Sequence, residues 1–175
     1  NFIFNNFSAD FNFHDVVKEA GVQGFTEPDP KIDLSGIDVA RKILILIRES
    51  GYQMEIEDIE NNSFLPDACM NTTNNNDFFN SLRTHASHFE NLLKEANEKE
   101  SRLKFVATFE NGKASVGLQF IPKDSPFYTL EGKDNIVQFY TDRYVDQPLL
   151  IKGAGAGAAV TASGIFADVI RIGNV

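Results

Sequence analysis

The sequence has no tryptophan, a single cysteine and no long hydrophobic run. The cysteine, Cys69, excludes an internal disulfide and fits a reducing compartment. It lies in a polar stretch without a nearby histidine, which favours a bystander over a nucleophile. The longest aliphatic run, residues 43–47, is far shorter than the roughly 20 apolar residues needed to cross a bilayer. No secretory signal is visible, so we expect a cytoplasmic protein without a membrane partner.

Positive charge is also scarce, because 16 lysines and arginines face 25 aspartates and glutamates and leave a net charge of −9. Phosphate binding requires a basic surface, so this balance argues against a nucleic-acid partner. The 175 residues are enough for one domain with a sizeable core. The opening residues NFIFNNF resemble the middle of a structural element, so we expect a piece of a longer protein.

Hydrophobic spacing divides the first part of the chain into helices separated by polar segments. It predicts a short amphipathic helix over 10–21 and a mostly buried helix over 36–50. Alternation over 54–59 indicates a short strand. The asparagine-rich stretch 61–76 predicts a mobile polar loop, and residues 77–100 return to helical spacing.

The second part of the chain is dominated by strands. Residues 103–109 and 113–121 flank Asn111-Gly112, a dipeptide that closes tight hairpins. Residues 135–140 and 148–152 add two strands, and a glycine-rich turn then leads into a final helix. We therefore predict an α+β fold with a mixed or antiparallel sheet of about four to five strands and helices mostly on one face.

The stretch GFTEPDPKIDLSG at 24–36, here called the acidic strap, is more acidic than a plain connector needs to be. Pro28 and Pro30 fix the backbone on both sides of Asp29, which predicts a stiff segment. With the first turn of the following helix, the strap supplies four acids: Glu27, Asp29, Asp33 and Asp38. These acids precede Lys42, one turn beyond Asp38.

Asp38 and Lys42 are four residues apart and project from one face of a helix. A surface ion pair explains that spacing on its own, and Asp33 or Ser35 could simply cap the helix. Capping does not explain Glu27 or Asp38. Five aliphatic residues follow Lys42, so we expect poorly solvated surroundings that would suit acid–base chemistry. The strap would then hold the ammonium of an amino-acid substrate while Lys42 serves a reacting oxygen.

Two further patterns are weaker signals. GAGAG at 153–157 would let a backbone approach a ligand closely, but its spacing differs from the dinucleotide fingerprint, and close helix–sheet packing also explains it. His85 and His88 are three residues apart and could share a metal. No carboxylate or cysteine completes a ligand set at a recognisable spacing, so we expect no metal site.

Taken together, these stretches resemble one known family. GFTEPDPKIDLSGIDVARK, residues 24–42, is similar to the substrate-site signature of the homoserine dehydrogenases, and residues 139–172 are similar to their C-terminal segment. The resemblance is dense over 1–51 and 133–172. The insert at 60–101 is similar to that of bifunctional enzymes that fuse an aspartokinase to the dehydrogenase.

The resemblance implies roles for individual residues. Lys42 matches the lysine that donates a proton to the substrate oxygen. Phe25 stands where many relatives have tyrosine, so any hydrogen bond from that hydroxyl is absent here. The substrate-binding acids of the family match Glu27, Asp33 and Asp38. The positions at the nicotinamide cofactor match Gly24, Glu27 and Gly157.

The implied activity is that of an oxidoreductase that interconverts aspartate semialdehyde and homoserine with NADP or NAD, in threonine, methionine and isoleucine biosynthesis. Residues 1–175 would be its substrate-binding, catalytic and dimerisation domain, without the nucleotide-binding domain that carries a second active-site lysine and most of the cofactor site. The monovalent-cation site is also expected outside this chain. We expect a homodimer whose isolated piece does not turn over. Two alternatives stay open: a non-catalytic amino-acid-binding module and a purely structural dimerisation domain.

Overall fold

The computed structural model describes residues 2–132, 134–155 and 158–174. The chain divides into two compact units, a larger one over Phe2–Tyr128 and a smaller one over Thr129–Val175. The boundary falls in the loop that follows Ile121, where prolines and a glycine interrupt the regular elements. Nothing in the hydrophobic spacing indicated this division, because both sides of the loop have ordinary strand patterns.

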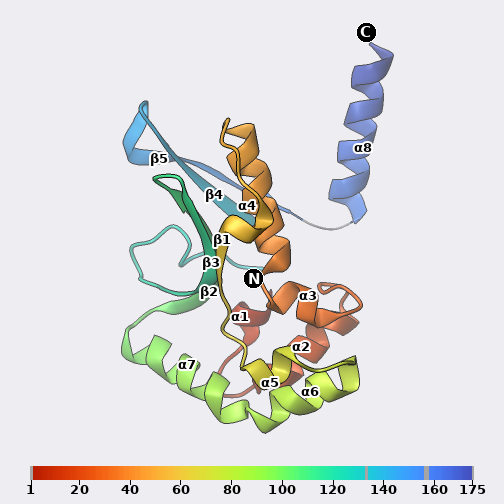
Figure 1. Cartoon of the computed structure of the whole chain (residues 1–175), viewed down its shortest axis with the longest axis vertical. Coiled ribbons are helices and arrows are strands. Elements are labelled where there is room, and N and C mark those ends of the chain that lie inside the picture. The colour runs from red at the N-terminus through yellow and green to blue at the C-terminus, as the bar shows by residue number, and fades with distance from the viewer. Residues whose placement is uncertain (1, 133, 156–157, 175) are drawn as a thin grey trace. The chain divides into compact units, whose positions relative to one another are not determined.

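Helices make up the first part of the larger unit (Figure 1). The helices predicted over 10–21 and 36–50 are confirmed, and the one predicted over 77–100 divides into two because His85 leaves the helical conformation, at φ −99° and ψ 24°. The elements are α1 (Phe2–Asn6), α2 (Phe13–Val22), α3 (Pro30–Leu34), α4 (Ile37–Glu49), the short 3₁₀ helix η1 (Ile56–Asp58), α5 (Asp67–Met70), α6 (Asn75–Thr84) and α7 (Ala86–Glu98).

The sheet of the larger unit has three strands: β1 (Ile59–Asn62), β2 (Arg102–Glu110) and β3 (Lys113–Ile121). They lie in the order β1-β3-β2, with β1 parallel and β2 antiparallel to β3. The predicted hairpin is confirmed. Asn111 and Gly112 join β2 to β3 with positive φ values of 51° and 75°, the backbone conformation that a tight hairpin turn requires.

The strand predicted over 54–59 is mostly wrong. The carboxylate of Asp58 accepts a hydrogen bond from the Glu55 backbone N–H at 2.9 Å and closes the turn that becomes η1. The strand therefore begins only at Ile59 and continues to Asn62. Apolar residues do alternate in this stretch, but a local side-chain hydrogen bond determines its backbone conformation.

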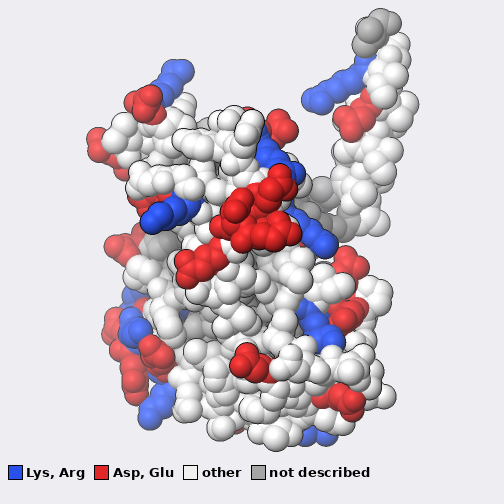
Figure 2. Space-filling model, in the orientation of Figure 1, with Lys and Arg blue, Asp and Glu red and all other residues white. Residues whose placement is uncertain are grey.

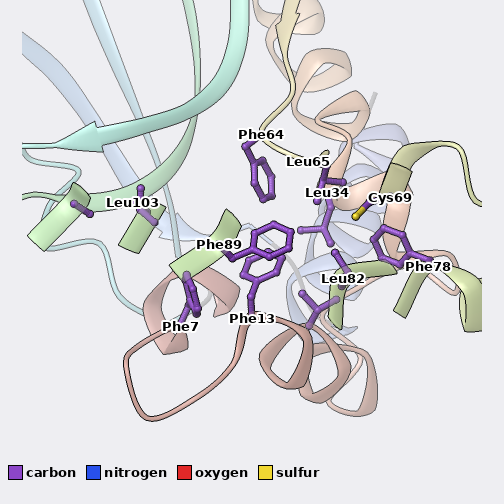
Figure 3. Close-up of a cluster of buried hydrophobic side chains, with 12 residues drawn as sticks. Phe7, Phe13, Leu34, Phe64, Leu65, Cys69, Phe78, Leu82, Phe89 and Leu103 are labelled. Carbon is purple, nitrogen blue, oxygen red and sulfur yellow. The ribbon is translucent and has the colours of Figure 1, made fainter. Parts of the chain in front are cut away.

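A cluster rich in phenylalanine forms the main core of the larger unit (Figure 3). Phe13 of α2 stacks on Phe89 of α7 with ring centroids 4.2 Å apart, and Phe64 meets both rings edge-on. Leu34, at the end of α3, belongs to the same cluster and is buried. The core therefore anchors the C-terminal part of the acidic strap.

The mobile polar loop predicted over 61–76 is wrong as secondary structure. This stretch contains the end of β1, all of α5 and the start of α6, and it buries Phe64, Leu65 and Cys69 in the main core. Asparagines outnumber these apolar residues in the sequence, and their spacing fits no single period. Periodicity therefore could not predict that these apolar residues are buried.

Helix α4 packs against β2 and β3 and forms a second core cluster. Its buried stripe is Ala40, Leu44 and Ile47, which meets Ile59 and Val116 of the sheet. The opposite side of the helix is open to solvent, so α4 is half-buried rather than mostly buried as predicted. Its polar side is the one that carries Asp38 and Lys42.

The smaller unit is a two-stranded antiparallel ribbon followed by a helix. It consists of β4 (Asp134–Thr141), β5 (Tyr144–Ala154) and α8 (Ala158–Gly173). The α+β class is confirmed, and the described residues form five strands, in a sheet of three and a sheet of two rather than in the one predicted sheet. Among the described residues, no helix is both long and apolar enough to cross a membrane.

Candidate functional site

The acidic strap connects α2 to α4 and contains the short helix α3. Asp29 caps α3, because its carboxylate accepts a hydrogen bond from the Lys31 backbone N–H at 3.0 Å. Pro30 occupies the start of that helix, where a missing N–H costs nothing, and its side chain is buried. The stiffness predicted from the two prolines thus has a structural basis in a capped and anchored turn.

Asp33 ties the two ends of the strap together. Its carboxylate accepts a hydrogen bond from the Glu27 backbone N–H at 2.9 Å, across six residues. The prediction that Asp33 or Ser35 caps α4 is wrong, since that helix begins at Ile37 and its N-cap is Gly36, without a side-chain capping bond. Ser35 lies one residue earlier, and its Oγ accepts a bond from the Ile37 N–H at 3.4 Å. Asp33 therefore shapes the strap.

The strap meets α4 at a position that accepts only glycine. Gly36 has a φ of +83°, and a Cβ built there would lie 2.7 Å from Cζ of Phe105 in β2. Next to it, the carbonyl of Ser35 accepts a hydrogen bond from Nδ2 of Asn61 in β1 at 2.7 Å. The sheet thus fixes where the strap ends and where the first turn of α4 begins.

Three acids of the site lie close enough to influence one another. Burial raises the pKa of Asp33, and the negative charges of Asp38 and Glu27 raise it further, while the bond from the Glu27 N–H acts in the opposite direction. A half-buried carboxylate among like charges is costly unless a cation joins it. The arrangement therefore favours a positively charged ligand.

Acidity alone does not single out the strap. Figure 2 shows acidic side chains gathered on the surface near η1 as well, and there Arg48 pairs with Glu55 at 2.6 Å. Those acids are exposed. What distinguishes the strap is convergence around the partly buried Asp33.

Lys42 forms an ion pair with Asp38, with 2.7 Å between Nζ and Oδ2. The side chains are 59% and 41% exposed, so the predicted poorly solvated environment of Lys42 is wrong in this structure. The five aliphatic residues after it belong to the buried and flanking faces of α4, not to the face that carries Lys42. The pair marks a solvent-accessible cation beside Asp38, one of the three acids.

The remaining positions singled out from the sequence are Gly24, Phe25 and Gly157. Gly24 follows α2 with a φ of +71°, and a Cβ built there would meet nothing within 4 Å, so there is open space on that side of the residue. Phe25 is 44% exposed and its ring lies 4.9 Å from that of Phe2. Gly157 lies outside the described residues.

Two contacts that the sequence did not reveal hold the strap from outside. Nζ of Lys31 donates a hydrogen bond to the carbonyl of Thr72 at 2.6 Å, and Nδ2 of Asn75 donates one to the carbonyl of Pro28 at 2.8 Å. Both partners lie more than forty residues further along the chain. No local pattern reports pairings of that range, so only the fold could show them.

The histidine pair shows other partners. His85 donates from Nδ1 to the Ser81 carbonyl at 2.9 Å, and His88 donates from Nε2 to the Phe64 carbonyl at 2.8 Å. A carbonyl oxygen only accepts, which assigns the proton to the ring nitrogen in each case. Within the described ranges, no group of three or more potential ligands is placed to hold a metal ion.

The strap and α4 supply carboxylates that suit a small cationic group, and one of them, Asp38, is paired with Lys42. Carboxylates bind ammonium groups, and a lysine can donate a proton to an oxygen within hydrogen-bond distance. Such a combination suits an enzyme domain that handles an amino acid.

Comparison with known proteins agrees with this class. The family model described as homoserine dehydrogenase matches residues 1–170. A bifunctional aspartokinase/homoserine dehydrogenase 1 of Zea mays, described as chloroplastic, is 43% identical over 99% of this chain and 19% of its own length. The homoserine dehydrogenase of Saccharomyces cerevisiae is 39% identical over 98% of this chain and 49% of its own length.

A solved structure supports the same relationship. A Candida auris protein of unknown function superposes with a TM-score of 0.87 at 37% identity, over 99% of this chain and 50% of that one. The chain therefore belongs to the homoserine dehydrogenase family. It spans about a fifth of the length of the bifunctional relatives and about half of the yeast enzyme.

Proposed function

We propose that this chain is the substrate-binding and catalytic part of an enzyme that interconverts aspartate semialdehyde and homoserine. The observation that carries the proposal is the convergence of Glu27, Asp33 and Asp38 beside Lys42 in a member of this family. Both substrates carry an ammonium, which the acids attract, and both carry the oxygen whose proton changes during the reaction.

The proposed chemistry divides between strap and helix. The strap acids bind the substrate ammonium, which keeps its charge throughout the reaction, and so hold the substrate at the site. Lys42 donates a proton to the carbonyl oxygen as negative charge develops there, and takes it back in the reverse direction. Asp38 lies 2.7 Å from Lys42 and orients the ammonium of Lys42 towards the site.

The cofactor in this proposal is NADP or NAD, and the residues present fit one edge of it. When bound, the nicotinamide supplies or accepts the hydride. There is open space on one side of Gly24, which suits contact with a flat ring, and Gly157 is assigned to the same group from the family pattern. Most of the cofactor site belongs to a nucleotide-binding domain outside this chain, so we expect the isolated chain to be inactive.

The parent protein is proposed to act in threonine, methionine and isoleucine biosynthesis, in the cytoplasm, and to carry an aspartokinase as several relatives do. We further propose a homodimer formed through the smaller unit. Its ribbon and helix expose large apolar side chains, among them Val145 at 66%, Ile151 at 56% and Phe166 at 66%. Exposed apolar surface of this kind is typical of an interface. Sedimentation of the parent would test it.

The test of the proposed activity uses the complete parent enzyme with Lys42→Ala, followed through the oxidation of NADPH by aspartate semialdehyde. A positioned general acid predicts a fall in kcat of about 10²- to 10⁴-fold. Lys94→Ala is the matched control, because that lysine is also exposed on a helix and pairs with an acid four residues away. Equal rates for both variants would show that the proton comes from elsewhere.

A parent enzyme with no activity towards aspartate semialdehyde would instead favour the non-catalytic amino-acid-binding module. Homoserine binding that disappears in Glu27→Gln would then identify that module. Binding that is absent altogether would leave the structural dimerisation domain.

A further inference from the structure

The segment at 72–75 contacts the acidic strap at two points. The side-chain amide of Asn75 donates to the carbonyl of Pro28 at 2.8 Å, next to Glu27 in the chain. The carbonyl of Thr72 accepts from Nζ of Lys31 at 2.6 Å, two residues before Asp33. The two contacts therefore lie near Glu27 and Asp33, the two strap acids assigned to the substrate.

The contacting segment is itself firmly held. Oγ1 of Thr72 donates to the carbonyl of Cys69 at 2.9 Å, and Cys69 is fully buried. Asn74 caps α6 by accepting the backbone N–H of Asp77 at 2.9 Å. One turn into that helix, Phe78 is fully buried in the main core. The segment can therefore transmit the rigidity of the core to the strap.

The contact from Lys31 also has an electrostatic consequence. Lys31 is the one lysine or arginine within the strap sequence, so it is the nearest candidate to neutralise the strap acids. Among the described residues, its ammonium forms no ion pair with any of them and instead bonds the Thr72 carbonyl. Bound in this way, it does not neutralise Glu27 or Asp33, and their charge can attract an incoming ammonium.

We propose that Asn75 and Lys31 are positioning residues that hold the acidic strap in its substrate-binding geometry, through the Pro28 carbonyl and the Thr72 carbonyl. The inference rests on the proposed function, because the strap matters only if its acids bind substrate. The proposal gives a role to residues 72–75 of the asparagine-rich stretch, which hold the strap in place. We call this segment the brace.

The expected kinetic signature follows from where the acids act. They hold the substrate ammonium, which does not change during the reaction, so they bind the ground state and the transition state alike. Losing the brace should therefore raise KM for homoserine and leave kcat nearly unchanged. KM for NADP should change less than KM for homoserine, because Glu27 is the one assigned cofactor position that lies beside either contact.

The first test compares Asn75→Ala, Asn75→Gln and Asn76→Ala in the complete parent enzyme, with steady-state kinetics in homoserine and in NADP. Asn76 is the control, because it is the next residue of the same helix and no bond from it to the strap is found in the described chain. For Asn75→Ala we expect KM for homoserine to rise about three- to tenfold, as for the loss of one hydrogen bond. Asn75→Gln retains the amide donor and should recover part of the loss.

The second test, Lys31→Met, separates positioning from charge. Removing a positive charge from the strap would by itself strengthen the attraction for an ammonium and lower KM for homoserine. Loss of the bond to Thr72 instead predicts a higher KM. A raised KM, with a thermal midpoint close to that of the wild type, supports the brace.

Other outcomes overturn the inference. Asn75→Ala indistinguishable from Asn76→Ala, or Lys31→Met with a lowered KM, would show that the strap keeps its geometry unaided. A fall in kcat at constant KM would also contradict a brace that acts through ground-state binding. A wild-type parent that does not oxidise homoserine would refute the proposed function itself, which is a separate result.

Discussion

The phenylalanine core and the acidic strap lie in the same unit but differ in the side chains that they bury. In the core, Phe13, Phe64 and Phe89 are buried against one another within a cluster of apolar side chains. In the strap, Glu27 is exposed, and the pKa of Asp33 is raised by partial burial and by the like charges near it. Burial of the core lowers the free energy of the folded state, whereas burial of the charged Asp33 raises it.

This contrast shows how a small fold supports a costly site. The strap contributes little apolar surface, so its geometry depends on a few attachment points: its own Leu34 in the core, its Gly36 at the sheet and the contacts from the segment 72–75. Stability and substrate binding should accordingly respond to different substitutions. Four predictions test that separation, beginning with the largest change in stability.

Phe89→Ala should destabilise the chain by about 3 to 5 kcal/mol, because it empties a fully packed position in the core. Phe25→Ala in the strap should cost about 1 kcal/mol or less, since that ring is 44% exposed and touches mainly Phe2. Urea unfolding of the purified chain measures both. Comparable losses would mean that the strap is part of the core.

Gly36→Ala should destabilise the chain by about 2 to 4 kcal/mol, since the new methyl group adds a clash with Phe105 to the strain of a positive φ. Gly51→Ala is the control, because Gly51 has a similar φ of +89° and open space around its Cβ position. It should show the strain alone, about 1 to 2 kcal/mol. Equal losses would show that the sheet does not confine the strap.

Asp33→Asn should stabilise the fold at neutral pH while it weakens substrate binding. The pKa of Asp33 is raised in the folded chain, so the folded state holds the proton more tightly than the unfolded state does. The resulting penalty is absent below the ordinary carboxyl pKa and complete above the raised one. The variant also keeps an oxygen to accept the Glu27 N–H.

The measurement for Asp33→Asn is unfolding free energy from pH 3 to pH 7 beside the wild type. The stability advantage of the variant should grow as pH rises through the carboxyl range. If the unfolding free energy of the wild type instead rose relative to that of the variant with increasing pH, the result would contradict the raised pKa of Asp33 and the balance of charges described for the strap.

The smallest effect concerns two exposed ion pairs with the same spacing. Asp38→Asn and Glu95→Gln each break one pair, Asp38–Lys42 or Glu95–Lys99, and each should cost about 0.3 to 0.5 kcal/mol. In the parent enzyme, only Asp38→Asn should raise KM for homoserine. An equal effect of Glu95→Gln on KM would remove the distinction between site and surface.

Local patterns in the sequence were sufficient for several elements. The Asn111-Gly112 hairpin, α2, α4 and the α+β class follow from turn chemistry and periodicity, which depend on neighbouring residues. The pairing of Asp38 with Lys42 follows from helical spacing in the same way. Predictions failed where long-range packing competed, as in the asparagine-rich stretch that buries Phe64 and Cys69.

The sequence by itself determined which chemical groups the site contains: an acidic, proline-stiffened strap directly before a helix that carries a lysine. Only the tertiary structure decided how those groups are held and how much solvent reaches them. It placed Lys42 on the open side of α4, made Asp33 a tie to Glu27 and brought Thr72 and Asn75 against the strap. Spacing along a chain fixes contacts within a few residues, whereas solvent exposure and distant hydrogen bonds depend on how all the elements pack.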